Sequence, residues 1–556
     1  MNEISSHIPG SREYLTKLRN NSRFLGALPK EEVSPSDRRG NTEKTSDKNI
    51  SDNVDLTCIS TKGTEEELIP VIISARNPFQ GDLLLAPGAF TSEKVSMRNI
   101  KVDRTLGGGE VIARVSRETA EKLKNEGYNV TSNETQYILP SYFEPAHDNG
   151  VEPEERELKN EKKDIPFELN ATTKINELKT TGKGIAIAIL DTGIYPHPDI
   201  KDKIIAFKDF VNDRETPYDD NGHGTHVAGD AAGTGMVSGG KYKGTAPEAN
   251  LVGIKVLNSD GGAKVSDIVE GIDWVIQNRD QYNIRIINMS VGVPVTRDQC
   301  NAINQAVKRA SDAGIIVVAA AGNEGPVEGT IAAAPGNSPY AITIGAVDDK
   351  NTPQKDDDDI ASFSSRGTED GLLKPDLVAP GTNIISLNVP GSEIAKQATA
   401  INYIKQLPDD KLRILPPVLY ENFGMNPELV TGKSDGELRK FWNKTFSKLN
   451  INSIDDDYIS MQGTSMATPL TAGIVADMLE INPQLSPSQV KDILTKTADD
   501  MGKPKTSQGA GVLDAMEAIQ VAEKTKGELP EIFAQMKTQS MGYLISGSGG
   551  KIAFNG

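Results

Sequence analysis

The run GIAIAIL at residues 184–190 is followed at once by Asp191-Thr192-Gly193, and this stretch decides the fold. An unbroken apolar run of this length is typical of a strand buried on both faces, as in a parallel sheet. Helical patterns at 265–279 and 298–314 separate further runs of this kind, and strands that alternate with helices indicate βαβ units. We therefore predict an α/β fold with a mostly parallel central sheet flanked by helices. The further strands are expected in ANLVGIKVL (249–257), IRIINMSV (284–291), GIIVVAAAG (314–322) and YAITIGAV (340–347).

A small α+β unit is predicted before this domain. ELIPVIISA and EVIARV have strand patterns, and SRETAEKLKNEGY has a helical pattern with Ser116 as N-cap and Gly127 as C-cap. Two helical patterns and a Pro-rich stretch interrupt the α/β domain at 391–457, which we interpret as an insertion. The predicted divisions are a disordered N-terminal segment (1–64), the α+β unit (65–145), a charged linker (146–164), the main domain (165–525) and a C-terminal tail (526–556).

Composition excludes several classes of partner. The formal net charge is −18, and an acidic surface repels nucleic acid and anionic lipid, so neither is expected as a partner. No apolar run is long enough to predict a membrane span. The N-terminus has no apolar signal-peptide core, so a cytoplasmic location is expected, with export by a non-classical route as the alternative. The two cysteines, Cys58 and Cys300, agree with a reducing compartment and leave a disulfide between them open.

The histidines point to a candidate base. Serine is a poor nucleophile at neutral pH and needs a base within hydrogen-bond reach, usually a histidine oriented by an acid. Two of the five histidines, His223 and His226, share the motif NGHGTHVAG at 221–229. Its glycines permit a tight turn beside a reacting centre. We predict that His223 is the base and that His226 packs or forms hydrogen bonds. The alternative for a lone histidine is a surface residue or a satisfied core residue.

The candidate acid and nucleophile lie at a strand end and a helix start. Asp191 ends the first buried strand, at the edge where open α/β sheets place their sites; a turn or cap role is the alternative. Ser465, in QGTSMATPLTAG (462–473), is expected to open a helix with Pro469 in its first turn. The N–H groups and the positive dipole end there would suit a developing oxyanion. For Ser465 the alternative is an N-cap.

Asn323 follows the buried strand at 314–322 and could donate its amide to the oxyanion, or simply form a turn.

Four motifs together resemble the signatures of the subtilases, and their order of Asp, His and Ser is the subtilisin order. The resemblance covers about 165–390 and 458–525, and its nearest branch is the AprX-like bacterial subtilases, which lack a signal peptide. The motifs are DTGI (191–194), GHGTHVAG (222–229), AAAGNEG (319–325) and GTSMATP (463–469).

This resemblance implies a serine endopeptidase that acts on proteins or peptides through an acyl-enzyme, with Asn323 and the Ser465 N–H as oxyanion donors. It also implies that an extended substrate pairs with the backbone of one strand end, and that a second stretch forms the floor of the pocket for the side chain before the cleaved bond. Backbone pairing tolerates many sequences, so broad specificity with an apolar preference is expected. The pairing residues would be Ser290, Val291 and Gly292, and the floor Ala319, Ala320, Ala321 and Gly322.

By the same resemblance, residues 65–145 are predicted to be an inhibitory propeptide. The stretch TQYILPSYF (135–143) would block the active site, with Ile138 and Leu139 in apolar subsites, and the linker 146–164 would be cut and lost. The alternative is a stable accessory domain that never leaves.

The sequence departs from the simple subtilisin pattern at the insertion 391–457, which either rims the active site or decorates the surface. No cofactor is required for the chemistry. Subtilases often bind structural calcium, which stays possible here, although the usual binding loop is not recognisable. The four carboxylates of Asp356–Asp359 are interpreted as a solvated loop and not as a metal site.

Two other functions compete with peptidase activity. A pseudoprotease that binds a partner would be favoured by the loss of a triad residue, and none is missing. An esterase with the same triad is the second alternative, but Ser465 lies in GTSMA and not in the GxSxG motif of α/β-hydrolases.

Overall fold

The computed structural model describes residues 68–75, 100–106, 109–126, 128–137, 179–293, 297–350, 352, 357–368, 371–415, 432–449 and 451–525. The predictions for the N-terminal segment 1–64, for the linker 146–164 and for the tail 526–556 lie outside these residues, as do those for Cys58, Ile138 and Leu139.

An eight-stranded, mostly parallel sheet forms the centre of the main domain, which confirms the predicted fold class. The order along the sheet is β13-β12-β11-β10-β6-β8-β7, with β14 also paired to β12, and only β13 runs antiparallel to its neighbour. The strands are β6 (Ala186–Asp191), β7 (Ile204–Asp209), β8 (Asn250–Lys255), β10 (Ile284–Met289), β11 (Ile316–Ala320), β12 (Ile342–Asp348), β13 (Asp359–Ile360) and β14 (Leu377–Pro380).

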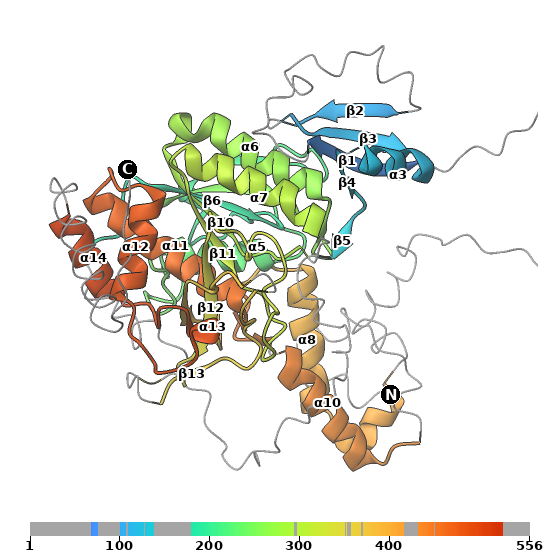
Figure 1. The fold of residues 1–556 in the computed structure, drawn as a ribbon. Helices are drawn as coiled ribbons and strands as arrows, with labels where there is room; N and C mark the ends of the chain where they lie inside the picture. The colour runs from blue at the N-terminus through green and yellow to red at the C-terminus, as the bar shows by residue number, and fades with distance from the viewer. Residues whose placement is uncertain are drawn as a thin grey trace, which may run out of the picture. The chain divides into compact units, whose positions relative to one another are not determined.

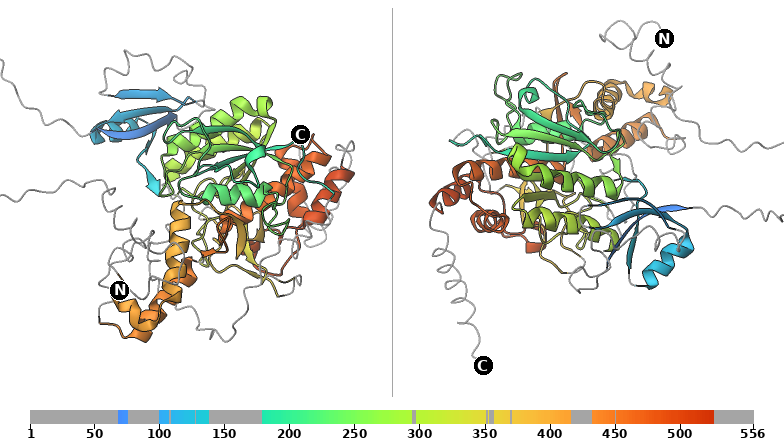
Figure 2. Two further views of the ribbon diagram at one scale, coloured as in Figure 1. Left: turned by 180° about the vertical axis from the view of Figure 1, so that it is seen from behind. Right: turned by 90° about the horizontal axis from the view of Figure 1, so that it is seen from above.

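Helices cover both faces of this sheet, and β6 shows why its sequence is apolar throughout. Ile187 and Ile189 belong to the core under one helical layer, whereas Ala186, Ala188 and Leu190 belong to the core under the other. Alternate side chains of a strand point to opposite faces, so a strand between two layers must be apolar at every position. The layers are α5 (His223–Ala232), α11 (Thr464–Ile481), α12 (Pro487–Thr497) and α14 (Ala515–Lys524) on one face, and α6 (Val265–Tyr282) and α7 (Arg297–Asp312) on the other (Figures 1 and 2).

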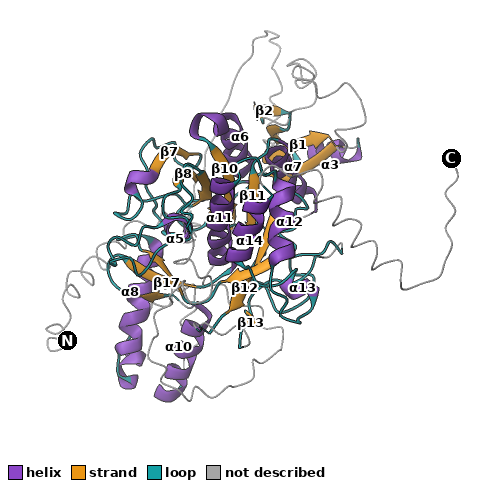
Figure 3. Ribbon diagram, turned by 90° about the vertical axis from the view of Figure 1, so that its left-hand side faces the viewer, coloured by secondary structure: helices purple, strands orange, loops and turns teal. Residues whose placement is uncertain are grey.

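The predicted insertion 391–457 connects two strands of a small antiparallel sheet, β15 (Ile384–Leu387) and β17 (Tyr458–Met461). The third strand, β16 (Asn452–Ser453), belongs to the insertion and pairs with β17. It carries α8 (Glu393–Gln406), a short 3-10 helix, η4 (Asp409–Ile414), and α10 (Asp435–Leu449). Figure 3 shows α8 and α10 side by side. None of the helices that the structure describes is long and apolar enough to span a bilayer.

The N-terminal unit is α+β. Its strands β1 (Ile69–Ala75), β2 (Lys101–Thr105), β3 (Val111–Val115) and β4 (Tyr128–Ser132) form an antiparallel sheet in the order β2-β3-β1-β4. The helix α3 (Arg117–Asn125) has Ser116 as its predicted N-cap, and the Ser116 hydroxyl accepts from the N–H of Thr119. The predicted C-cap was wrong by one residue, because Glu126, in right-handed helical geometry, is the C-cap and its N–H bonds back to Lys122.

Candidate active site

The carboxyl end of β6 and the start of α5 bring Asp191 and His223 together. His223 Nδ1 lies 2.8 Å from Asp191 Oδ1, and the two side chains are almost completely buried. Burial lowers the pKa of His223, but the Asp191 carboxylate, with help from Asp219 and Asp230, raises it by more, so the net pKa lies above 6.5. Since an ionised carboxylate only accepts, Nδ1 carries the proton and Nε2 keeps its lone pair. Among the described residues, Nε2 has no hydrogen-bond partner.

The loop before His223 is held by a carboxylate that sequence reasoning missed. Asp219 accepts from the Thr192 hydroxyl, from the N–H groups of Asn221 and Gly222, and from both the N–H and the hydroxyl of Thr225. Asp219 precedes His223 by four residues, but no short motif marks a carboxylate that collects donors from a loop and a helix. Its position therefore follows only from the fold.

A buried lysine supports the same loop from β8. The side chain of Lys255 is completely buried beside Asp191 in the sheet register, and its ammonium lies 2.7 Å from Asp220 Oδ1. It also donates to the carbonyls of Thr192 and Leu257. A buried ammonium needs this many acceptors, since one left unpaired would be costly. Its pairing with Asp220 fixes the entry to the loop that carries His223.

Ser465 is the second residue of α11, after Gly463, which is the N-cap and has no side chain to contribute. Ser465 is therefore not an N-cap, and the alternative for this residue is excluded. Its side chain is 6% exposed, and its hydroxyl donates to the carbonyl of Ser290 at 3.2 Å. The structure thus gives the hydroxyl a partner other than His223.

The expected place of Pro469 in the first turn of this helix was wrong. Pro469 is the sixth residue of α11, where a missing N–H leaves the carbonyl four residues earlier without its helical partner. That carbonyl belongs to Ser465, and it accepts instead from the hydroxyl of Ser290 at 2.7 Å. The proline is tolerated because a residue from β10's end replaces the lost hydrogen bond.

Asn323 lies beside the start of α11 with a defined orientation. Its Oδ1 accepts from the N–H of Thr464 at 2.9 Å and from the Thr464 hydroxyl at 3.1 Å. The amide nitrogen therefore occupies the other position of the Asn323 side-chain carboxamide. A β-carbon on Gly463, which has φ +151°, would lie 3.4 Å from that nitrogen. Glycine at this position keeps the space beside the amide open.

The residues expected to bind substrate lie at the carboxyl ends of β10 and β11. Pairing between β10 and β11 stops at Met289 and Ala319, so residues 290–292 continue beyond the sheet. Ala319 and Ala320 end β11, and Ala321 and Gly322 follow it towards Asn323. The sequence also missed a neighbouring edge, the two-residue strand β9 (Gly262–Ala263), which pairs antiparallel with β5 (Gln136–Tyr137) of the N-terminal unit. A two-residue strand such as β9 has no periodicity from which to predict it, whereas β5 lies within the stretch 135–143 that was predicted to be extended.

His226 lies one turn after His223 and is completely buried. Its Nδ1 lies 3.0 Å from Asp230 Oδ2, and its Nε2 lies 3.2 Å from the carbonyl of Ile459. Both ring nitrogens thus have partners in the core, in agreement with the prediction that His226 packs or forms hydrogen bonds.

The described residues contain no group of three or more His, Cys, Asp or Glu side chains that could hold a metal ion. Of the predicted acidic loop, Asp357 is exposed and Asp359 pairs with Lys503 at 2.9 Å. Asp358 is buried, so the solvated interpretation was wrong for this residue; Asp356 lies outside the described residues.

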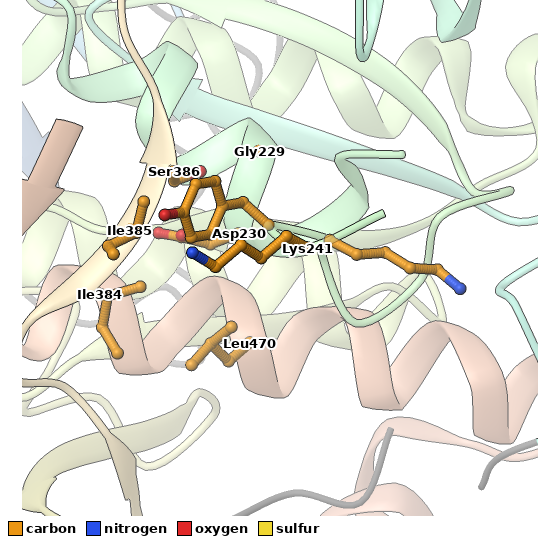
Figure 4. Close-up of a pocket in the computed structure, with 9 residues that line it drawn as sticks. Gly229, Asp230, Lys241, Ile384, Ile385, Ser386 and Leu470 are labelled. Carbon is orange, nitrogen blue, oxygen red and sulfur yellow. The ribbon is translucent and has the colours of Figure 1, made fainter. Parts of the chain in front are cut away.

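A separate hollow lies beside Gly229 and Asp230 in the second half of α5 (Figure 4). Asp230 and Ser386 give it polar walls and Leu470 an apolar one. It contains none of the predicted site residues. Its lining is Gly229, Asp230, Lys241, Tyr242, Lys243, Ile384, Ile385, Ser386 and Leu470.

Comparison with known proteins identifies the family of this chain. Residues 182–512 match the subtilase family (Peptidase_S8), and the chain belongs to this family. It is a subtilisin-like serine protease, as the names of its relatives indicate.

Two relatives and one solved structure illustrate how similar this chain is to known proteins. The chain is 44% identical over 348 residues to serine protease AprX from Bacillus subtilis (strain 168), which covers 61% of this chain and 67% of that protein. It is 32% identical over 335 residues to subtilisin Savinase from Lederbergia lenta, covering 60% of this chain and 90% of the relative. The solved S41 psychrophilic protease is 27% identical with a TM-score of 0.46, and covers 63% of this chain and 97% of its own.

Proposed function

We propose that this protein is an endopeptidase in which Asp191, His223 and Ser465 form the catalytic triad. The observation that carries the proposal is the 2.8 Å contact between Asp191 Oδ1 and His223 Nδ1, which leaves Nε2 as a free base. A carboxylate in this place holds the tautomer and stabilises the imidazolium formed during the reaction. Protein substrates follow from membership of the protease family.

The reaction begins when the Ser465 hydroxyl turns from the Ser290 carbonyl to His223 Nε2, a contact that often tightens only when substrate binds. His223 takes the proton as Ser465 Oγ attacks the scissile carbonyl. The oxyanion then accepts from the Asn323 amide and from the Ser465 N–H, which lacks a helical partner because it is in the first turn. His223 gives its proton to the leaving amine, and water releases the acyl group by the reverse path.

Substrate recognition is proposed to rest on backbone pairing with Ser290–Gly292, with Ala319–Gly322 as the floor of the pocket. The strand β9 is a further candidate edge, because β5 already pairs with it as an extended peptide would. Main-chain pairing leaves the sequence of the substrate largely free, so we expect broad cleavage with an apolar preference.

A chromogenic peptide and a simple ester separate this function from its alternatives. We expect wild type to hydrolyse the peptide and Ser465→Ala to be inactive. Hydrolysis of the ester alone would favour an esterase. Absence of both activities, together with no reaction of Ser465 with a fluorophosphonate, would favour a pseudoprotease.

We also propose that the N-terminal unit is an inhibitory propeptide that is removed by self-processing. Its last described strand, β5, pairs with β9 close to the loop that carries His223, since the carbonyl of Ser259 accepts from the side chain of Asn221. A segment in this position competes with an extended substrate for the same edge.

Specific contacts support docking of this unit on α6 and α7. Ile72, Leu106 and Ile112 belong to the core that includes these helices. Asn133 Oδ1 accepts from the N–H of Ser266 and caps α6, whose own N-cap residue makes no side-chain cap. Arg104 lies 2.6 Å from Glu270 of α6. Departure of the unit would leave both the cap and the apolar face unsatisfied.

Mass spectrometry of incubated protein tests this second proposal. Wild type should lose a fragment of roughly the first 150 residues while Ser465→Ala stays full length. The separate N-terminal unit with Arg104→Glu should inhibit mature enzyme less than the unaltered unit. A matched control is Arg114→Glu, since Arg114 pairs with Asp103 of the same unit. Wild type that stays intact and fully active would favour a permanent accessory domain.

A further inference from the structure

The segment 391–457 begins and ends at the tip of a β-hairpin that lies against the helix of His223. In this hairpin Leu387 pairs with Tyr458, and the N–H of Asn388 donates to the carbonyl of Asp457 at 2.8 Å. The two ends of the segment are therefore adjacent. The contacts that the segment makes with other parts of the protein are separate from the contacts that close the hairpin.

The first turn of α8 satisfies its free N–H groups on the loop before His223. The first four N–H groups of a helix have no partner within the helix. Here Glu393 donates to the carbonyl of Asp220 at 3.1 Å, and Ile394 donates to that of Asn221 at 3.0 Å. The other two belong to the N-cap Ser392, which donates to the carbonyl of Val389 at 3.1 Å, and to Ala395, which donates to the Ser392 hydroxyl at 3.2 Å.

The loop that receives these bonds leads directly into the base. Asn221 Oδ1 accepts from the N–H of His223 at 3.1 Å. Gly222, with φ +105°, lies so close to Ser392 that a β-carbon on it would be 2.7 Å from the Ser392 hydroxyl. Only glycine fits both the backbone angle and the space. A shift of the start of α8 would therefore be passed on to the backbone of His223.

The strands on either side of the segment hold the next turn of α5. Ser386 of β15 donates its hydroxyl to the carbonyl of His226 at 2.8 Å, and the carbonyl of Ile459 in β17 lies 3.2 Å from His226 Nε2. After Met461, β17 leads through Gly463 to Ser465. The segment is thus linked to the helix of the base and to the start of the helix of the nucleophile.

Apolar packing that is continuous with the core of the main domain can keep α8 in place. Ile394, Ile401 and Ile404 of α8 and Trp442 of α10 are buried in one apolar cluster. Arg439 of α10 donates to the carbonyl of Ile404 at the end of α8. A helix fixed along its length by such contacts can hold its first turn against the loop.

We propose that the segment 391–457 is a brace that positions His223, and that the N–H of Glu393 is the contact through which it acts. This inference rests on the proposed function, because it assigns the base to His223. Glu393 is a positioning residue and touches no reacting atom. The brace contributes to the rate of the chemical step and leaves substrate affinity nearly unchanged.

Glu393→Pro tests this contact without breaking the helix. Proline is favoured at the first helical position, and Ser392 already has the extended geometry, φ −65° and ψ 166°, that a residue before proline requires. The variant removes only the N–H that bonds Asp220 and the side chain that pairs with Lys396. Glu393→Ala removes the same side chain but keeps the N–H, so it is the matched control.

Turnover should be measured per active site titrated with a fluorophosphonate, because a merely structural role would lower the number of active sites and not their rate. One neutral hydrogen bond corresponds to a factor of about five. Glu393→Pro should therefore lower kcat about five-fold with KM changed by less than about two-fold, and Glu393→Ala should match wild type. Equal kcat values for all three proteins would overturn the proposal.

A second variant covers the case in which Glu393→Pro does not fold. Replacing residues 389–456 with Asn-Gly closes the hairpin by a two-residue turn between Asn388 and Asp457, whose backbones are already bonded. It loses both loop contacts of α8, so kcat per titrated site should fall about twenty-five-fold. A titrated deletion variant with wild-type kcat refutes the brace. Failure of wild type itself to cleave peptides refutes the proposed function instead.

Discussion

The buried carboxyl of Asp477 predicts that stability falls as the pH rises through neutrality. Asp477 is on α11 and completely buried, and the described residues place no hydrogen-bond partner on either of its oxygens, although Thr180 and the backbone of Gly182 face it. Burial, with a smaller contribution from Glu480, raises its pKa to about 8. In the unfolded chain an aspartate has a pKa of about 3.9.

The sign and size of the effect follow from these two pKa values. Between about pH 4 and pH 8 the native protein keeps a proton that the unfolded chain has lost, so raising the pH favours unfolding. Each unit of difference between the two pKa values corresponds to ~1.4 kcal/mol, so the full loss of unfolding free energy is on the order of 5 kcal/mol. This loss is complete above about pH 8. From pH 6 to pH 8 the part due to Asp477 is about 2 kcal/mol.

Asp477→Asn removes the ionisable carboxyl and should abolish the contribution of Asp477 to the pH dependence of stability. Urea unfolding of the Ser465→Ala protein, which cannot digest itself, should be compared at pH 6 and pH 8 with and without Asp477→Asn. The free energy of unfolding of the variant should gain about 2 kcal/mol on its parent over this interval. Asp492→Asn, at a half-exposed aspartate paired with Lys496, is the control and should show no such gain. A difference between Asp477→Asn and its parent that does not change with pH would show that Asp477 does not keep a proton in the native protein over this interval.

Three further predictions concern the reaction. Asn323→Ala should lower kcat by roughly 10²–10³ with little change in KM, a factor known from oxyanion donors of this kind; a pure change in KM would assign Asn323 to substrate binding. The acid limb of the kcat/KM profile should have its midpoint above pH 6.5, because the base must be neutral and Asp191 raises the pKa of His223; a midpoint below 6.5 would contradict this. His223→Ala should be far more severe than His226→Ala, and equal losses would remove the distinction between them.

Much of the fold could be predicted because its signals are local. The run before Asp191 is apolar at every position since β6 lies between two helical layers, and the glycine-rich motifs mark the turns before α5 and α11. Asp191, His223 and Ser465 could be proposed because each follows a strong boundary of this kind. The geometry adds the 2.8 Å contact between the first two.

The remaining features depend on contacts between distant residues. Pro469 is deep in α11 because Ser290, 175 residues away, satisfies the carbonyl of Ser465. Asp477 lies between the apolar runs 474–476 and 478–479 of α11, and no pattern tells a buried carboxyl from a solvated one. The bonds from α8 to the loop at Asp220 are main-chain contacts, so the side-chain sequence could not predict them. Such features follow only from the tertiary structure.

The reaction of wild type with a fluorophosphonate tests the central claim most directly, when the labelled residue is located by peptide mass spectrometry and the remaining peptidase activity is followed. Label should appear on Ser465, and activity should be lost in proportion to labelling. Ser465→Ala should take up no label and keep less than about a thousandth of the wild-type rate. Label on another serine, or substantial peptide hydrolysis by Ser465→Ala, would contradict the assignment of Ser465 as the nucleophile.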